Sequence, residues 1–193
     1  VSNDVKAFSD KPIVLSPHPI FAHFGNPILK SEARKIIGQQ EEDKIILFFG
    51  FIRHYKGLDM LLKAMATDAI KNANIKLMVV GEFYENAQPY YDLIKTLGIE
   101  DRIILHTQFV PDEEVKNFVC SADFIIQPYR NATQSGVTPL AYHFEIPMLV
   151  TNVGALADTV PHGKVGFVVE PSVEAIANGT VSYTHLRAHE TLM

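Results

Sequence analysis

The 193-residue sequence lacks several features that would each point to a class of protein. Cys120 is its only cysteine, which excludes a disulfide within the chain and a multi-cysteine zinc site. Lys and Arg number 17 against 22 Asp and Glu, so there is no basic excess of the kind that binds nucleic acid. The apolar runs fall well short of the roughly 18 residues that a membrane-spanning helix needs. No glycine-rich dinucleotide fingerprint, P-loop or nucleophile elbow occurs, and the missing fingerprint counts against an NAD enzyme.

The N-terminus has neither an initiator methionine nor a basic-then-apolar signal pattern, so we expect the chain to be processed or cut. Prolines are dense in the next stretch of sequence. Each proline fixes its own φ and restricts the residue before it, which favours an extended, stiff segment. We therefore predict that residues 1–25 form a linker, on the evidence of Pro12, Pro17, Pro19 and, just beyond, Pro27.

The apolar residues come in short, dense blocks that are rich in β-branched and aromatic side chains. A buried helix would need roughly 10 to 12 residues, which none of these blocks has. Continuous apolar runs of this kind are typical of strands that are buried on both faces. The predicted strands lie at 45–49, 75–80, 103–105, 124–126, 148–150 and 165–169.

Stretches with helical spacing alternate with these strands. The predicted helices lie at 31–37, 58–65, 90–97, 115–122, 138–145 and 155–160. Such alternation predicts an α/β fold, a Rossmann-like parallel sheet flanked by helices on both faces, in a single domain over residues 26–180. Ligands of these sheets bind beyond the carboxyl ends of the strands, so the loops after the strands are the place to look for a site.

The loop after the first strand, from Gly50 to Gly57, reads G-F-I-R-H-Y-K-G. Its glycines allow the backbone to approach a ligand closely. Arg53 and Lys56 place two cations beside the start of the next helix, where they would suit a diphosphate. A solvated turn with two surface cations would have the same spacing, so the residues alone leave both interpretations open.

The loop after the fourth strand reads Y-R-N-A-T-Q-S-G-V-T-P. Ser135, Gly136 and Val137 lead into a helix with Pro139 in its first turn, and their backbone N–H groups would be free to bind an anion. An ordinary helix cap explains the pattern equally well. Gly81 ends the second strand, and a glycine in that place is common.

Six motifs stand in a fixed order along the chain: G-F-I-R-H-Y-K-G-L-D, V-V-G-E, F-V-P-D-E-E-V, S-A-D-F-I-I-Q-P-Y, S-G-V-T-P-L-A-Y and P-M-L-V-T-N-V-G-A-L. Together they resemble the C-terminal, donor-binding domain of family 4 retaining glycosyltransferases, whose architecture is GT-B. The resemblance covers about residues 12 to 177. It implies that this chain is one half of a GT-B fold, with the end of an N-terminal domain and the interdomain linker in residues 1–25.

The resemblance assigns roles to residues in several loops. Arg53 and Lys56 match the catalytic cations that contact the donor's diphosphate, although the arginine of the family often follows the glycine directly. The segment from Phe109 to Pro111 matches the stretch that packs on the base. The implied donor-binding residues are Gly50, Gly81, Phe109, Val110, Thr133, Gln134, Ser135, Gly136 and Val137.

One departure from the family concerns two glutamates that many members carry at i and i+8. The first lies near the transferred sugar, and the second holds the ribose hydroxyls. Alignment on Gly136 puts these positions at Thr133 and Ala141, and neither residue is a carboxylate. Ala141 has no side-chain acceptor for a ribose hydroxyl, whereas Thr133, Gln134 or Ser135 could replace part of the first role.

The reaction implied by the family is transfer of a sugar from a nucleotide-diphosphate sugar, with retention, to a glycan or lipid-linked acceptor. The protein would act mainly by stabilising the departing diphosphate, which itself deprotonates the acceptor, with no metal and no cofactor. The acceptor site belongs to the N-terminal domain, so we expect this chain alone to be inactive. The implied location is cytoplasmic, either free or peripheral on the inner face of the membrane.

The last residues, 181–193, do not continue the family pattern. Their sequence, V-S-Y-T-H-L-R-A-H-E-T and two more residues, resembles a translated sequencing adapter, which predicts a non-native tail. The alternative is a native amphipathic helix. The chain's histidines are scattered, and the only pair at helical metal-ligand spacing, His185 and His189, lies in this tail.

Two other functions stay open on the sequence. A degenerate, non-catalytic nucleotide-binding domain is favoured by the missing glutamates. A GT-B-like nucleotide-sugar epimerase would carry its own acidic and histidine residues in the cleft, and the sequence offers no such set.

Overall fold

The computed structural model describes residues 5–14, 20 and 23–190 of the chain. Pro17, His18 and Pro19 lie outside this range, as do residues 191–193 of the predicted tail. In the described part of the predicted linker, Phe8 and Val14 are 90% and 88% exposed. Their side chains are therefore not part of a core, and the linker boundary at residue 25 stays a prediction.

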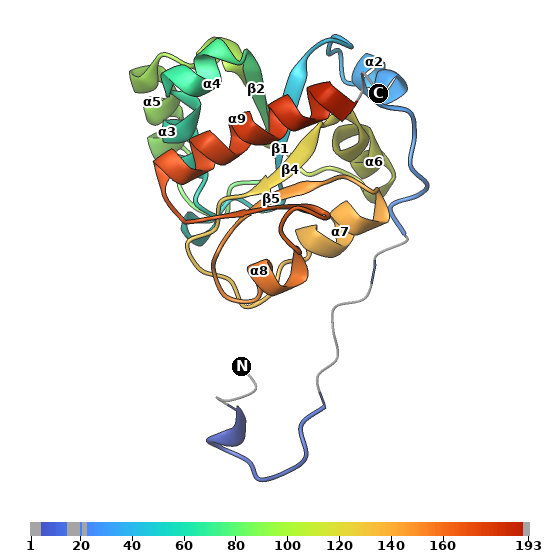
Figure 1. Ribbon diagram of the computed structural model, residues 1–193, viewed down its shortest axis with the longest axis vertical. Helices are drawn as coiled ribbons and strands as arrows, with labels where there is room; N and C mark the ends of the chain where they lie inside the picture. Colours follow the sequence, from blue (N-terminus) through green and yellow to red (C-terminus); the bar gives the residue numbers. More distant parts are fainter. Residues whose placement is uncertain (1–4, 15–19, 21–22, 191–193) are drawn as a thin grey trace.

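Six parallel strands form one sheet, which confirms the predicted fold class (Figure 1). The strands stand in the order β3-β2-β1-β4-β5-β6. The chain first adds strands on one side of β1 and then returns to add β4 on the other, and such a reversal is where α/β sheets bind ligands. The strands are β1 Lys44–Phe49, β2 Ile75–Val80, β3 Ile103–His106, β4 Phe124–Gln127, β5 Met148–Thr151 and β6 Gly166–Val169.

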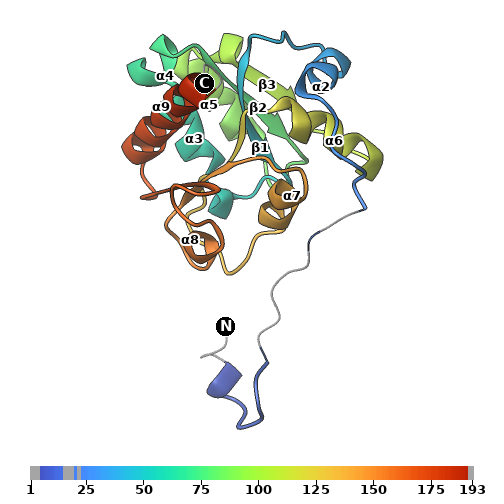
Figure 2. The same cartoon turned by 45° about the vertical axis from the view of Figure 1, so that its right-hand side comes forward.

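Helices cover both faces of the sheet, as Figure 2 shows for α3, α4, α5 and α9 on one side and α2, α6 and α7 on the other. Short 3-10 turns, η1 and η2, precede α3 and β3. The elements are α2 Lys30–Ile36, η1 His54–Lys56, α3 Leu58–Met65, α4 Asp68–Asn72, α5 Gln88–Leu97, η2 Glu100–Arg102, α6 Asp112–Ser121, α7 Val137–His143, α8 Leu156–Thr159 and α9 Val173–Glu190.

The strands alternate their side chains between two hydrophobic cores. Ile46 and Phe48 of β1 join the core under α3, α4, α5 and α9, whereas Ile45 and Leu47 join the core under α2, α6, α7 and α8. Because both faces of the four central strands, β1, β2, β4 and β5, are buried, these strands read as continuous apolar runs in the sequence, whereas the edge strands β3 and β6 are only partly buried. This burial is the reason why the strands could be predicted.

Helix α9 continues through residue 180 into the predicted tail. Tyr183 is 8% exposed, and its ring packs edge-on against Phe124 and Phe167 at centroid distances of 4.7 and 5.4 Å. The first tail residues therefore complete the core between α9 and the sheet. Their origin as adapter sequence stays a prediction.

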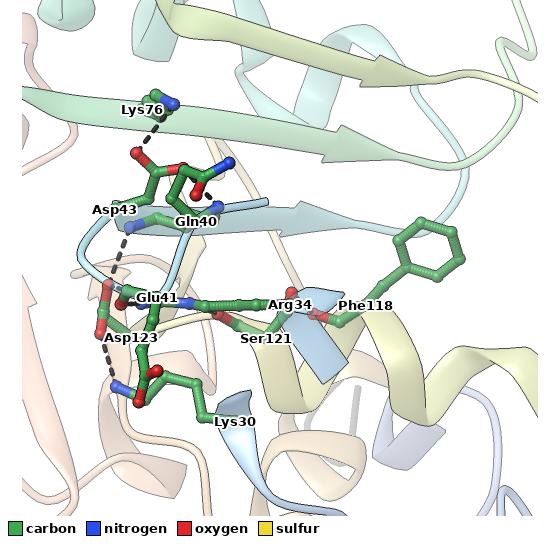
Figure 3. Close-up of polar contacts among 10 residues, drawn as sticks. Lys30, Arg34, Gln40, Glu41, Asp43, Lys76, Phe118, Ser121 and Asp123 are labelled. Carbon is green, nitrogen blue, oxygen red and sulfur yellow. Dashed lines mark hydrogen bonds and ion pairs between the residues drawn. The ribbon is translucent and has the colours of Figure 1, made fainter. Parts of the chain in front are cut away.

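At the amino edge of the sheet, Asp123 ties helix α2 to two strands (Figure 3). Its carboxylate accepts hydrogen bonds from Lys30 Nζ at 2.7 Å, Arg34 Nη2 at 3.0 Å and the backbone N–H of Ile45 at 2.8 Å. Arg34 also donates to the carbonyls of Ser121 and Glu41. The buried guanidinium thus has acceptors on two segments, at Glu41 and at residues 121–123, and this network holds the edge opposite to the expected site.

None of the helices in the described part of the chain combines the length and the apolar character that crossing a membrane requires.

Candidate functional site

The loops after β1 and β2 meet at the carboxyl edge of the sheet. Gly50 donates to the carbonyl of Val80 at 2.8 Å, and Ile52 donates to that of Glu82 at 2.8 Å. A Cβ on Gly81, whose φ is +134°, would lie 2.5 Å from the carbonyl oxygen of Gly50. Gly81 is therefore required for the close approach of the two loops, and the chain supplies glycine where the backbones meet.

The turn η1 sits directly against the end of β4. Gly57 has a φ of +70°, and a Cβ there would lie 2.0 Å from the carbonyl oxygen of Pro128. Lys56 donates from its backbone N–H to Arg53 at 2.9 Å, which closes the turn. Because Gly57 lets this turn pack against β4, the side chain of Lys56 points back towards the loop after β4.

A cavity of about 220 Å³ lies between these two loops. It brings together six of the predicted residues, from the first loop and from the loop before α7. Its walls also include aromatic side chains and one leucine that the sequence did not single out. The lining residues are Phe24, Phe49, Gly50, Phe51, Tyr55, Lys56, Tyr129, Gln134, Ser135, Gly136, Val137 and Leu140.

Lys56 is the buried cation of this cavity, with 8% of its surface exposed. Its Nζ lies over the ring of Tyr129, 5.7 Å from the centroid, and no ion pair to it is found in the described part of the chain. Burial, and secondarily the charge of Arg53, lower the pKa of Lys56 to about 8. The ammonium is still largely protonated at neutral pH and has no acidic partner among the described residues, so it is available to an anion.

Arg53, the other predicted cation, does not line the cavity. It is exposed, and its guanidinium carbon lies 4.5 Å from the centroid of the Tyr84 ring. The side chain therefore stands on the rim, near enough to Lys56 to affect its pKa. The structure thus separates the two cations into one inside the cavity and one beside it.

The loop before α7 differs from the prediction at one amide. The backbone N–H of Val137 donates to Ser135 Oγ at 3.2 Å, so this amide is not free as predicted, whereas the place of Val137 among the donor-binding residues stays a prediction. Ser135 stands one residue before Gly136, the N-cap of α7, and its hydroxyl accepts from the first residue of the helix. Among the described hydrogen bonds, none uses the backbone N–H groups of Ser135 and Gly136, and these two amides border the cavity.

Alignment with the family puts the ribose position at Ala141, and Ala141 does not line this cavity. Ala141 has no exposed surface and belongs to the core under α7, whereas Leu140 lines the cavity. Val137 and Leu140 are three residues apart and share the helix face that looks at the cavity, and one further residue rotates Ala141 away from it. Thr133 is exposed on the loop and does not line this cavity.

Phe109 and Val110 line a separate cavity of about 350 Å³ beyond the end of β3, together with His106. Gly81 lies between the two cavities, since its N–H donates to the carbonyl of His106 at 2.9 Å while its Cα borders Gly50. Burial lowers the pKa of His106. The predicted base-binding and phosphate-binding residues thus occupy neighbouring loops of one edge.

An ion pair that the sequence did not predict braces the turn of Lys56. Arg130 donates to both carboxylate oxygens of Asp59 at 2.7 and 2.8 Å and to the carbonyl of His54 at 3.2 Å. Its backbone N–H donates to the carbonyl of Tyr55 at 2.7 Å. Glu85, from the loop after β2, accepts the backbone N–H of His54 at 3.1 Å. Two neighbouring loops therefore hold the backbone of η1.

Among the described residues, no group of three or more histidine, cysteine or acidic side chains is arranged to hold a metal ion.

The geometry defines a Rossmann-like domain with a cationic cavity at the carboxyl edge of its sheet. The sequence model of the family described as "Glycosyl transferases group 1" matches residues 30–189. This chain belongs to that family.

Curated relatives have similar sequences but are much longer. The chain is 29% identical over 143 residues to the uncharacterized glycosyltransferase MJ1607 of Methanocaldococcus jannaschii, a match of 74% of this chain and 36% of the relative. It is 27% identical over 150 residues to a D-inositol 3-phosphate glycosyltransferase of Corynebacterium aurimucosum, covering 75% and 35%. The chain thus spans about a third of the length of these relatives.

Solved structures of GT-B glycosyltransferases share the fold. Sucrose-phosphate synthase from Thermosynechococcus elongatus matches with a TM-score of 0.75 at 20% identity, over 88% of this chain and 42% of that one. The C-terminal domain of LpcC, a group 1 protein of Francisella tularensis, matches with 0.64 at 16% identity, over 84% and 95%. Anabaena HepE in complex with UDP matches with 0.68 at 18% identity, over 90% and 51%.

Proposed function

We propose that this chain is the C-terminal, donor-binding domain of a family 4 glycosyltransferase that transfers a sugar, with retention, from a nucleotide-diphosphate sugar. The observation that carries the proposal is the buried Lys56 ammonium, which faces a cavity at the switch point of the sheet and has no acidic partner in the part of the chain that the structure describes. The family membership and the likeness to the separately solved C-terminal domain of LpcC support it.

The chemistry of the cavity favours a diphosphate as its occupant. A buried cation without a counter-charge is costly, and an anion that enters the cavity would offset that cost. Gly50 and Gly136 line the cavity without side chains, which leaves room for phosphate oxygens next to the ammonium. The backbone N–H groups of Ser135 and Gly136 would donate to the same anion.

In the proposed reaction, these groups act on the leaving diphosphate. Negative charge grows on the phosphate oxygen as the bond to the sugar breaks, and Lys56 would stabilise it from inside the cavity. Arg53 would add its charge from the rim after leaving the ring of Tyr84. Thr133 and Gln134 precede Ser135 in the same loop and would lie near the transferred sugar. No step of this reaction requires a metal.

We further propose that residues 26–180 form the donor domain and that a separate N-terminal domain supplies the acceptor site. A GT-B active site lies between its two domains. The chain alone would then bind donor without transferring sugar to an acceptor. Detectable sugar transfer by the 193-residue chain would contradict this division.

Calorimetric titration of the chain with UDP, GDP and ADP tests the donor site, and HepE, solved with UDP, makes UDP the first choice. We expect one nucleotide to bind and Lys56→Ala to weaken it by about 1 to 3 kcal/mol, the range for a charge-assisted hydrogen bond. Arg53→Ala should weaken binding less, by about 0.4 to 1 kcal/mol, because its side chain is exposed. Lys35→Ala, an exposed cation of α2, is the matched control and should change nothing. Failure of a folded chain to bind any of the three nucleotides would refute the proposal.

A non-catalytic nucleotide-binding domain is the second candidate. Thr133 and Ala141 stand at the positions where the family's carboxylates are expected, and neither of them is acidic. This candidate predicts the same nucleotide affinity but no sugar release when the chain is joined to its N-terminal domain and given a bound nucleotide sugar. Sugar release with retention would exclude it.

A further inference from the structure

Tyr129 lies between the two loops that form the cavity, and it is 2% exposed. It directly follows Pro128 at the end of β4. Its ring faces the Lys56 ammonium, with 5.7 Å between Nζ and the ring centroid. Its hydroxyl lies 3.3 Å from Ser135 Oγ, the same oxygen that accepts the backbone N–H of Val137. One side chain therefore contacts both predicted anion-binding segments.

The backbone of Tyr129 is fixed from the neighbouring strand and loop. Its carbonyl accepts a hydrogen bond of 2.6 Å from the hydroxyl of Thr151, at the end of β5. The next residue, Arg130, donates its N–H to the carbonyl of Tyr55 at 2.7 Å. The ring of Tyr55 also packs edge-on against that of Tyr129, with 6.0 Å between centroids. The side chain of Tyr129 thus has little freedom to move.

The neighbour of the Lys56 ammonium is the aromatic ring of Tyr129 and not a carboxylate, and this difference affects the binding of an anion. A carboxylate at this place would neutralise the ammonium and compete with an incoming phosphate. The face of an aromatic ring attracts a cation more weakly and keeps its full charge available. The ring can hold the ammonium in place while leaving its charge to the ligand.

We propose that Tyr129 is a positioning residue of the diphosphate site, whose ring places the Lys56 ammonium and whose hydroxyl places Ser135. The inference rests on the proposed function, because it assigns Tyr129 to the site that binds the diphosphate. Tyr129 acts through its two neighbours and need not touch the ligand.

A double-mutant cycle on UDP affinity, measured by calorimetry, separates this role from a general effect on folding. We expect Tyr129→Leu to weaken UDP binding about tenfold in the chain that keeps Lys56, and less than about twofold in a Lys56→Ala background. Equal losses in the two backgrounds would overturn the role of the ring. Tyr183→Leu, which removes another buried ring at the opposite edge of the sheet, controls for lost packing and should leave UDP affinity unchanged.

Tyr129→Phe tests the hydroxyl, because it keeps the ring and removes only the contact with Ser135. We expect Tyr129→Phe and Ser135→Ala each to weaken UDP binding by about threefold, and the double variant to be no weaker than either one. If the loss of UDP affinity in the double variant equals the product of the two single losses, the role of the hydroxyl is overturned.

The position of Lys56 can also be followed without any ligand, by NMR of chains labelled with ¹³C at the lysine ε-carbons. The Lys56 signal, assigned through its loss in Lys56→Arg, should be displaced by the ring in the wild type and in Tyr129→Phe. In Tyr129→Leu it should move towards the signals of exposed lysines, and an unmoved signal would contradict the inference. If the Lys56 signal is displaced but the chain binds no nucleotide, the proposed function is refuted. If the chain binds UDP but the losses of affinity in the Tyr129 and Lys56 variants are additive, only the role of Tyr129 is refuted.

Discussion

At the amino edge of the sheet, Arg34 and Lys30 both reach the carboxylate of Asp123, whereas Lys56 at the carboxyl edge faces an aromatic ring. The two buried cations are similar in exposure, since the side chain of Arg34 is 4% exposed and Lys56 is 8% exposed. They differ in what surrounds them: Arg34 has a carboxylate and two carbonyls, and Lys56 has no acidic partner among the described residues. A buried cation therefore stabilises the fold at the amino edge, where it is Arg34, and is left available for a ligand at the carboxyl edge, where it is Lys56.

The largest expected effect on stability comes from removing the carboxylate of Asp123 at the amino edge of the sheet. Asp123→Ala would leave the buried guanidinium of Arg34 without its counter-charge and the N–H of Ile45 without its acceptor. We expect the free energy of unfolding, measured by urea denaturation, to fall by about 3 kcal/mol. Lys30→Ala removes an exposed partner of the same carboxylate and should cost less than about 1 kcal/mol. Similar losses in the two variants would contradict the view that burial of Arg34 is what matters.

At the carboxyl edge, removal of the buried charge of Lys56 is expected to raise the free energy of unfolding. Lys56→Met keeps the length of the side chain and removes a buried charge that none of the described acidic residues pairs with, so the ligand-free chain should become more stable by about 1 to 2 kcal/mol. The same variant should lose most of its affinity for UDP. Urea denaturation and calorimetry measure the two effects on one sample, and Lys35→Met serves as the exposed control. A Lys56→Met chain that is less stable than the wild type would contradict the comparison.

The free energy of unfolding and the affinity for UDP should both depend on pH, because the pKa of Lys56 is lowered to about 8 from its ordinary value of 10.5. Between these two values the unfolded chain holds the proton more often than the folded chain, so the contribution of Lys56 makes the ligand-free fold more stable as pH rises. Binding of a diphosphate needs the protonated form and should weaken above about pH 8, approaching tenfold per pH unit. Lys56→Arg, which stays charged, should remove this dependence from calorimetric titrations over about pH 7 to 9.5.

The fold could be predicted because the four central strands of its sheet are buried on both faces, which leaves a continuous apolar run for each of them in the sequence. Helix α4 was missed because its five residues are too few to show a helical period, and α9 because its second half was interpreted as foreign. Lys56 and Ser135 could be assigned to a site because each lies in a loop directly after a strand. The rest depends on tertiary contacts: the bond of Arg130 to Asp59 joins residues 71 positions apart, and the rotation of one helix residue decides that Leu140 and not Ala141 faces the cavity.

A smaller effect is expected from the brace between the two loops of the cavity. Arg130→Lys keeps the charge but cannot reproduce the paired hydrogen bonds to Asp59 together with the bond to His54. Both side chains of the pair are partly exposed, so the loss in the free energy of unfolding should be about 0.5 to 1 kcal/mol. We expect UDP affinity, measured by calorimetry, to fall about threefold because the turn that carries Lys56 loosens. Unchanged affinity would show that Glu85 and the backbone contacts hold the turn without Arg130.

The smallest effect should come from Arg53, the exposed cation of the same edge. Since Arg53 is exposed, Arg53→Ala should weaken UDP binding by only about twofold to fivefold, and raised salt should reduce the difference because exposed charges are screened. Tyr84→Leu removes the ring over which the Arg53 guanidinium lies and should leave the affinity unchanged or slightly improved. Calorimetry at low and high salt compares the two cations directly: the Lys56→Ala loss should persist in high salt while the Arg53→Ala loss shrinks. A salt response of the same size for both would mean that burial does not distinguish them, and the contrast between a cation inside the cavity and a cation on its rim would fail.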